Sequence, residues 1–378
     1  DMGHPLPLSP SKRHVIAGLL KTRYLLKKEN ADKLIYMEEI SQPEIRGVIK
    51  ILNTMGVLAY KASPLLVPLL VFKAVEISLK YGHAPGIAYC YAAYGMIHCG
   101  ILGDIDRGFE FGDLALKLAE RPDDKKYRAR TIHLVCCMIS HWKKHMRETV
   151  EQLLFAYKLG MEMGDIEDAT SSAHLYCAYR FFCGDDLNHL KNEMLHYDEM
   201  IKRFRQETNL NYLRIERQAV LNLTEGVADP WRLEGDVYNE KSMIPVHEKA
   251  GDMTAIAILF ILKMVLNFLF GRHVEADECA RIAEEKLDSL TALAFVPVFY
   301  FYDSLNTLAL LDSAPGAARK RLLRRAERAG KKFSRWADHA PMNYRHKHEL
   351  ILAGISGARG RLAGAMEYYD RTIEGALQ

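Results

Sequence analysis

The chain has 378 residues, of which 49% are hydrophobic and 26% charged. This is the composition of a globular protein, and it excludes a disordered chain. The chain contains 51 Lys and Arg and 48 Asp and Glu residues, which gives a formal net charge of +3. This charge is too small to indicate a nucleic-acid partner by itself. No stretch is apolar over the roughly 20 residues that a membrane span needs, and no signal peptide precedes the first predicted helix.

The seven cysteines form no CxxC pair, and most lie inside apolar helical runs. They are typical of reduced core residues, so we expect a cytoplasmic protein. Residues 1–40 are expected to form a loose, proline-rich start and a leading basic helix, and residues 41–378 a repeat region. Because the sequence starts without an initiator methionine and stops inside a repeat, we expect it to be a fragment of a longer protein.

Ile87–Glu120 is predicted to be an antiparallel helical hairpin. Small or apolar side chains recur three or four positions apart in its first half and again in its second half, which is the period of a helix with one buried face. Between them, Gly100–Asp106 has the glycines and aspartates of a turn. Three residues fall close to the small-residue positions of a tetratricopeptide unit, where larger side chains would push two helices apart: Gly95, Gly108 and Ala115.

Similar breaks, each followed by a fresh apolar helix, recur at intervals of about 40 residues. They lie near Ala62–Pro64, Gly103–Asp104, His145, Gly184–Asp186, Gly271–His273, Ser313–Gly316 and Gly360. One hairpin cannot bury both of its faces, so each needs similar neighbours. The sequence therefore predicts an all-α fold, an α-solenoid of antiparallel helical hairpins that forms a tetratricopeptide-like superhelix. Residues 225–240 are expected to be irregular, as a bend or an insertion.

Two segments near the C-terminus carry a more specific resemblance: FSRWADHAPMNYRHKHEL at Phe333–Leu350 and AMEYYDRTIEGA at Ala365–Ala376. Together with SLKYG at 78–82 and RQAVLNL at 217–223, their order and spacing resemble the tetratricopeptide-like middle region of large bacterial sensor kinases. In that family a protein-kinase-like domain and an AAA/STAND-type ATPase come first, and sensor and histidine-kinase domains often follow. The resemblance covers roughly residues 40 to 378.

The resemblance implies a non-catalytic regulatory and protein-interaction domain of a multidomain bacterial signal-transduction kinase or ATPase. Its partner is then another protein, or the parent's own ATPase or kinase domains. The chain has no GxxxxGK[ST] phosphate loop and no HRD or DFG triplet, so we expect neither catalytic residues nor a bound cofactor in it. The alternative is a small-molecule effector-sensing helical-repeat domain of a STAND-type regulator.

The most basic predicted helix spans residues 315–336, where Glu327 is the single acidic residue. Its candidate partner-binding residues are Arg321, Arg324, Arg325, Arg328 and Lys332. Such a helix suits an acidic protein domain, a phosphate-bearing ligand or nucleic acid. A nucleic acid would also need basic residues aligned over several repeats, which the sequence does not show, so we expect no nucleic-acid partner. A solvated basic face is the alternative interpretation.

The aromatic run FVPVFYFY, from Phe295 to Tyr302, lies in a predicted helix over 290–311. Its candidate effector-groove residues are Phe299, Tyr300 and Tyr302, since rings supply contact area and hydroxyls can orient a ligand. Pro297 is expected to kink this helix. Core packing is the alternative, because aromatic residues at helical spacing are usually buried.

His141 and His145 lie four positions apart, and on one helix their imidazoles would share a face. Two histidines are half of a metal site, and no obvious Glu or Cys completes it. We therefore predict no metal site and interpret the pair as polar surface at a helix end.

Overall fold

The computed structural model describes residues 6–377 apart from 8, 28–30 and 64. These residues form helices, most of them α-helices and most joined by short turns, and their extended pairings are two isolated bridges, Glu39–His83 and Glu234–Asn239. The predicted all-α fold is confirmed. None of the helices in the described ranges is long and apolar enough to cross a bilayer. The predicted loose start at 1–10 lies partly outside the described residues, as does Pro64 of the predicted break at 62–64.

The chain divides into two compact units: Asp1–Ser140 with Phe155–Ala169 (unit 1), and His141–Leu154 with Thr170–Gln378 (unit 2). Two helices, α8 (Met146–Met163) and α9 (Ile166–Phe182), contribute residues to both. The other elements of unit 1 are α1 (Lys12–Leu26), α2 (Ala31–Leu34), α3 (Pro43–Ala62), α4 (Leu66–Tyr81), α5 (Ile87–Met96), the π-helix η1 (Ile97–Leu102), α6 (Ile105–Ala119), the 3₁₀-helix η2 (Pro122–Tyr127) and α7 (Arg128–Met138).

Unit 2 begins within the 3₁₀-helix η3 (Ser140–Trp142) and contains the C-terminal half of the repeats. Its remaining elements are α10 (Leu187–Arg203), α11 (Glu207–Thr224), α12 (Glu240–Ala250), α13 (Met253–Leu269), α14 (His273–Lys286), the 3₁₀-helix η4 (Leu287–Leu290), α15 (Phe295–Ala309), α16 (Gly316–His339), α17 (Pro341–Ala358) and α18 (Leu362–Ala376).

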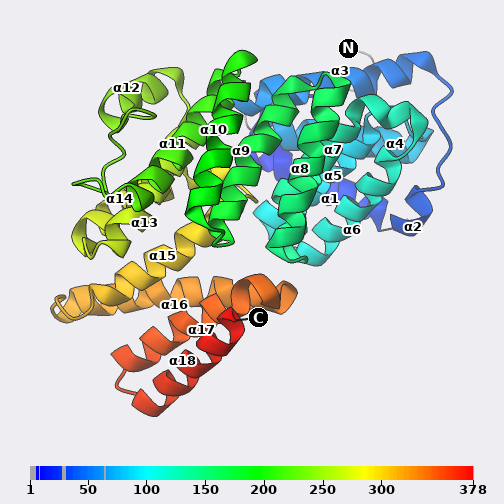
Figure 1. Cartoon of the computed structure of the whole chain (residues 1–378). Helices are drawn as coiled ribbons and strands as arrows, with labels where there is room; N and C mark the ends of the chain where they lie inside the picture. The colour runs from blue at the N-terminus through cyan, green and yellow to red at the C-terminus, as the bar shows by residue number, and fades with distance from the viewer. Residues whose placement is uncertain (1–5, 8, 28–30, 64, 378) are drawn as a thin grey trace. The chain divides into compact units, whose positions relative to one another are not determined.

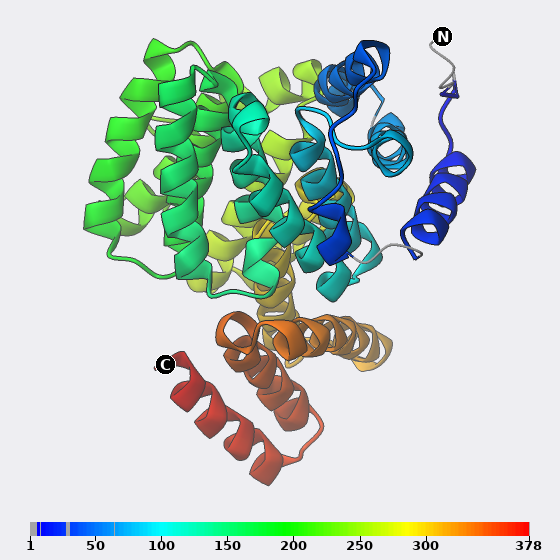
Figure 2. The ribbon, with the colours of Figure 1, turned by 90° about the vertical axis from the view of Figure 1, so that its right-hand side faces the viewer.

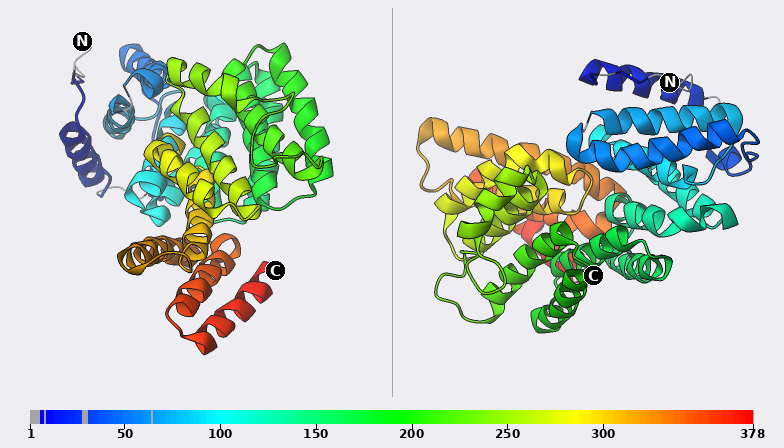
Figure 3. Two further views of the ribbon diagram at one scale, coloured as in Figure 1. Left: turned by 90° about the vertical axis from the view of Figure 1, so that its left-hand side faces the viewer. Right: turned by 90° about the horizontal axis from the view of Figure 1, so that it is seen from above.

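In both units the helices pair with their neighbours in the sequence, and each pair stacks on the next. In unit 1, α3 packs against α4 and α5 against α6, while α5 also contacts α3 and α7 (Figure 3). In unit 2, α13 pairs with α14, α15 with α16 and α17 with α18, while α11, α13, α15 and α17 contact one another in succession (Figures 1 and 2). This neighbour-to-neighbour packing of hairpins is that of an α-solenoid.

The α5–α6 hairpin shows why the small residues are needed. A Cβ atom at Gly95 would lie 2.6 Å from the Gly108 carbonyl oxygen and 2.9 Å from the Ile139 Cδ1 atom. A Cβ atom at Gly108 would lie 2.7 Å from the Gly95 carbonyl oxygen. The two backbones therefore approach too closely for any side chain at either position, as the hairpin prediction required.

The turn of this hairpin is shorter than the predicted Gly100–Asp106, because η1 continues the helix as far as Leu102. Gly103 then takes the left-handed conformation, with φ 68°, which a residue with a side chain rarely adopts. Asp104 caps α6 by accepting a hydrogen bond from the Arg107 backbone N–H at 3.4 Å.

Residues 225–239, between α11 and α12, contain no helix. Side chains of α11 hold the loop: the Asn222 amide donates to the carbonyl oxygens of Pro230, at 3.0 Å, and Arg232, at 2.6 Å. The Tyr238 backbone N–H donates to the Gln218 side-chain oxygen at 3.3 Å. The loop's backbone groups thus find partners on the preceding helix.

The helix predicted over 290–311 begins only at Phe295, after η4 and a short turn. Pro297 therefore lies in the first turn of α15, where a backbone N–H has no partner inside the helix. The predicted kink at Pro297 was wrong, because the helix does not extend far enough toward the N-terminus for the proline to interrupt it.

Candidate interaction surface

Helix α16 has one buried side and one strongly basic side. Its side chains that pack inward against α15 and α17 are Ala326, Ala329, Phe333 and Ala337, all of them buried. They recur three or four positions apart, which is the period of a helix with one buried side. Gly330 is also buried and faces Ile351 and Ile355 of α17.

The outward side is a row of exposed cations that we call the basic face: Lys320, Arg321, Arg324, Arg328 and Lys331. Together with Ala317 and Glu327 they line a groove of about 630 Å³. None of the five makes an ion pair with an acidic residue in the described part of the chain. The basic face thus carries positive charge that no described carboxylate neutralises within ion-pair distance.

Glu327 lies in the middle of the basic face but does not neutralise its positive charge. Its Oε1 atom accepts a hydrogen bond from Arg359 at the end of α17, at 2.6 Å. Glu327 is therefore already paired with a cation from outside the basic face, and Asp277 and Glu284 line a second pocket together with Arg321, Arg325 and Arg328.

Arg325 has a different role from its neighbours in the sequence. Its Nε donates to Asp303 Oδ2 at 2.9 Å, its Nη1 donates to Asp277 Oδ1 at 2.7 Å, and its Nη2 contacts the second oxygen of Asp303. Asp303 is buried, and burial raises its pKa to about 6 although the Arg325 guanidinium opposes the shift. Arg325 therefore binds α14 and α15 to α16 and is not available to a partner.

Lys332 and Arg319 also make contacts within unit 2. The Lys332 Nζ atom lies 4.3 Å from the centre of the Tyr300 ring, a cation–π contact. Arg319 donates to the carbonyl oxygens of Leu311, at 2.8 Å, and Ala358, at 3.0 Å. Of the five predicted partner-binding residues, the structure thus brings Arg321, Arg324 and Arg328 together on the basic face.

The three predicted effector-groove residues lie in the packing between helices. Phe299 is fully buried, so it belongs to the core and cannot line an open groove. Tyr300 is half-buried beside Trp336, with ring centres 6.0 Å apart, and Tyr302 lies edge-on to Phe268 at 5.8 Å. Phe299 therefore fits the alternative interpretation of this segment, in which the aromatic side chains pack in the core.

The interpretation of His141 and His145 as a pair on one helix face was wrong. Helix α7 ends at Met138, and His141 lies in η3 with no exposed surface. Its Nδ1 lies 2.7 Å from the Tyr344 hydroxyl and its Nε2 lies 2.8 Å from the Ala292 carbonyl oxygen. Burial lowers the pKa of His141 to about 4.

Further contacts fix the segment that contains His141 against the start of α17. The Asn343 side chain donates to the carbonyl oxygens of His141, at 2.8 Å, and Lys144, at 2.7 Å, and accepts from the Met146 backbone N–H at 3.0 Å. The Trp142 ring packs against Trp336, with ring centres 5.5 Å apart. We call His141, Trp142, Trp336, Asn343 and Tyr344 the central cluster.

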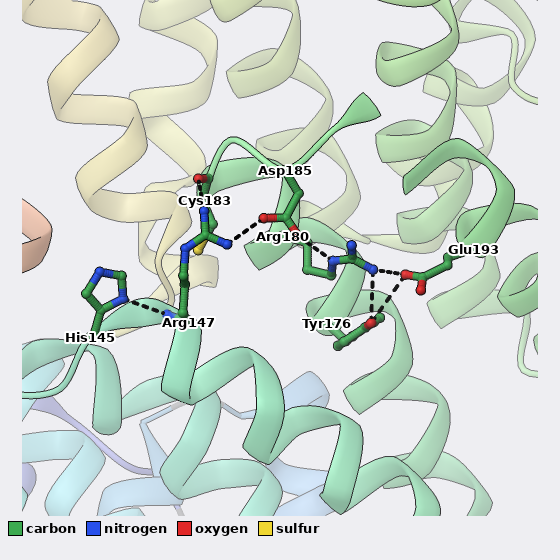
Figure 4. A network of polar contacts seen from close by, with 7 residues as sticks. All are labelled: His145, Arg147, Tyr176, Arg180, Cys183, Asp185 and Glu193. Carbon is green, nitrogen blue, oxygen red and sulfur yellow. Dashed lines mark hydrogen bonds and ion pairs between the residues drawn. The ribbon is translucent and has the colours of Figure 1, made fainter. Parts of the chain in front are cut away.

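His145 lies in a separate polar network near the start of α8 (Figure 4). Its Nδ1 atom accepts a hydrogen bond from the Arg147 backbone N–H at 3.1 Å. Arg147 reaches one oxygen of Asp185, at 2.8 Å, and Arg180 reaches the other, at 2.6 Å, so one carboxylate joins α8 to the end of α9. Arg180 also contacts Glu193, which extends the network to α10.

Among the described residues, no group of three or more His, Cys, Asp or Glu side chains could hold a metal ion. None of the seven cysteines forms a disulfide, and burial raises the pKa of Cys279 and Cys183 to about 11.

Comparison with known proteins does not assign the chain to a family. The sequence matches no protein-family model, and no curated protein is significantly similar to it.

Proposed function

We propose that this chain is a non-catalytic helical-repeat domain that binds an acidic protein surface through the basic face of α16. The observation that carries the proposal is the row of exposed cations Lys320, Arg321, Arg324, Arg328 and Lys331, none of which forms an ion pair among the described residues, while Glu327 within the row is paired with Arg359. Uncompensated cations on a rigid helix attract a complementary surface and steer its approach. Arginine is also well suited to carboxylates, since its planar guanidinium can donate two parallel hydrogen bonds.

The architecture supports a binding role of this kind. Stacked hairpins hold α16 between α15 and α17, so the basic face keeps its spacing without a partner. A partner that meets a preformed surface loses little conformational entropy of the chain on binding. We favour a protein over a nucleic acid because the basic face lies on a single helix, whereas a nucleic acid would be tracked by cations over several repeats.

The resemblance to bacterial sensor kinases suggests where the partner lies. We propose that the domain belongs to a cytoplasmic multidomain signal-transduction kinase or ATPase, and that the acidic surface is on a partner protein or on the parent's own ATPase or kinase domain. The support is the order and spacing of the segments 78–82, 217–223, 333–350 and 365–376, which lie on the stacked helices.

The test is a binding titration with a glutamate-rich helical peptide as the acidic probe, followed by fluorescence anisotropy. We expect the affinity to fall steeply as the salt concentration rises from about 50 to about 300 mM, because exposed charges are increasingly screened. The triple charge reversal Arg321→Glu, Arg324→Glu and Arg328→Glu should weaken binding at least about tenfold, since each reversed contact adds repulsion.

The matched control reverses three exposed lysines elsewhere: Lys125→Glu, Lys126→Glu and Lys249→Glu. It changes the net charge by the same amount and should retain most of the affinity. Equal losses in the two triple variants would show a general charge effect and contradict the proposal. A DNA duplex that binds more tightly than the acidic peptide would contradict the choice of a protein partner.

A further inference from the structure

Unit 1 contains a partly open cavity of about 220 Å³ between α3, α4, α5, α7 and the start of α9. Much of its wall is apolar, with side chains from four helices: Leu52, Val67, Leu70, Ala93, Met96 and Leu134. A cavity of about 150 Å³ is enough to bind benzene. The cavity in unit 1 is thus large enough for a molecule with a branched aliphatic or aromatic group.

Charged side chains of both signs also line this cavity. These are Arg130 of α7 and the two carboxylates Glu167 and Asp168, which lie in the first turn of α9. The Arg130 Nε donates to Asp168 Oδ2 at 2.7 Å, and the guanidinium carbon lies 5.5 Å from the centre of the Tyr89 ring. The two terminal Nη nitrogens of Arg130 have no hydrogen-bond partner in the described part of the chain.

We propose that this cavity binds a free α-amino acid with an apolar side chain. The Nη donors of Arg130 suit the ligand's carboxylate, which two parallel N–H groups can hold. The carboxylates of Asp168 and Glu167 suit its ammonium group. The apolar wall takes the side chain, since burying each CH₂ group from water is favourable.

Ligands with one charge fit this site less well. A carboxylic acid without an amino group would bring a third negative charge to Asp168 and Glu167. An amine without a carboxylate would leave the Arg130 Nη donors without an acceptor. A zwitterionic head group satisfies both, and polar groups placed at one part of an apolar pocket are what fixes a ligand's orientation. This inference concerns unit 1 and is independent of the basic face in unit 2.

The chain offers a variant that fills the cavity with little risk to folding. Gly56 lines the cavity from within α3, and a Cβ atom there would meet no other atom within 4 Å. The change Gly56→Leu replaces a helical glycine by a good helix former and places the new side chain in the cavity. Gly47→Leu is the matched control, since Gly47 lies in the same helix, has equally open space and does not line the cavity.

The experiment is calorimetric melting of the full chain with L-leucine, L-methionine or L-phenylalanine. At a ligand concentration about a hundred times Kd, the Tm of wild type should rise by about 5–10 °C. N-acetyl-L-leucine lacks the ammonium group and 3-methylbutylamine lacks the carboxylate, so neither should raise the Tm comparably. Gly56→Leu should abolish the rise, and Gly47→Leu should preserve it.

Three outcomes would overturn the proposal. The first is the absence of a Tm shift with any of the three amino acids. The second is an equal shift with the amine or the acetylated compound, which would mean that the site does not recognise both charges. The third is a full shift in Gly56→Leu, which would place the ligand outside the cavity.

Discussion

The His141 imidazole and the Tyr344 hydroxyl are 203 positions apart in the sequence and 2.7 Å apart in the fold. The second ring nitrogen, Nε2, faces the Ala292 carbonyl oxygen, which can only accept a hydrogen bond. Nε2 therefore carries the proton, and Nδ1 accepts from the Tyr344 hydroxyl. In an ideal solenoid each repeat contacts only its neighbours. Unit 2 departs from that rule because its first residues contact the start of α17.

Removing the Tyr344 hydroxyl should destabilise unit 2. Tyr344→Phe leaves the buried His141 Nδ1 without a donor, which costs about 1–3 kcal/mol. All three tryptophans, Trp142, Trp231 and Trp336, belong to unit 2, so the fluorescence change during urea unfolding reports on this unit. Tyr302→Phe is the control, because no described residue hydrogen-bonds the Tyr302 hydroxyl. A similar loss in both variants would show that the His141–Tyr344 bond does not matter.

The stability of unit 2 should fall in mild acid through His141. Its pKa is lowered from 6.5 to about 4 by burial, so between these values the unfolded chain binds a proton that the folded chain does not. The contribution of the neutral His141 to the free energy of unfolding is complete above pH 6.5 and is lost as the pH falls toward 4. The free energy of unfolding then falls by up to about 1.4 kcal/mol per pH unit and by about 3 kcal/mol in all. Urea unfolding followed by tryptophan fluorescence at a series of pH values measures it.

His141→Gln supplies the comparison, because glutamine does not titrate. This variant should be less stable than wild type near neutral pH, and the difference should shrink as the pH approaches about 4. Parallel pH profiles for the two proteins would exclude His141 as the source of the acid sensitivity.

The hairpins could be predicted because their signals are local. Gly95 and Gly108 lie within one pair of helices, and the turn between them needs a glycine at 103. No local sequence pattern of this kind predicted the central cluster. Its hydrogen bonds join η3 to α17, and nothing in the residues around His141 indicates a partner near position 344.

The basic face shows the same limit within a single helix. The helical period predicted that Arg324 and Arg325 lie in a basic helix, and they are adjacent in the sequence. Their roles differ because Asp303 and Asp277, on α15 and α14, lie within reach of Arg325. Which arginine is internal depends on helices elsewhere in the chain, and the sequence of α16 does not contain that information.

Adjacent arginines should therefore respond very differently to the same substitution. Arg325→Gln leaves the buried Asp303 carboxylate without its cation and should lower the free energy of unfolding of unit 2 by about 3 kcal/mol. Arg324→Gln removes an exposed cation and should change it by less than about 0.5 kcal/mol. Combining Arg325→Gln with Asp303→Asn should recover part of the loss, because the buried charge is then removed. Urea unfolding of the four proteins provides the comparison, and equal effects at 324 and 325 would contradict the assignment.

Two glycine-to-alanine changes in unit 1 should have opposite effects on the free energy of unfolding. Alanine normally stabilises a helix relative to glycine by about 0.5–1 kcal/mol, and Gly47→Ala should show this gain because its Cβ meets nothing within 4 Å. At Gly95 the same methyl group would lie 2.6 Å from the Gly108 carbonyl oxygen, so α5 and α6 must move apart. The lost packing should outweigh the helix gain and leave Gly95→Ala about 1–3 kcal/mol less stable. Thermal unfolding followed by circular dichroism measures both changes. A stabilised Gly95→Ala would show that the two helices tolerate a wider separation, and that the close approach at Gly95 and Gly108 is not what holds the hairpin together.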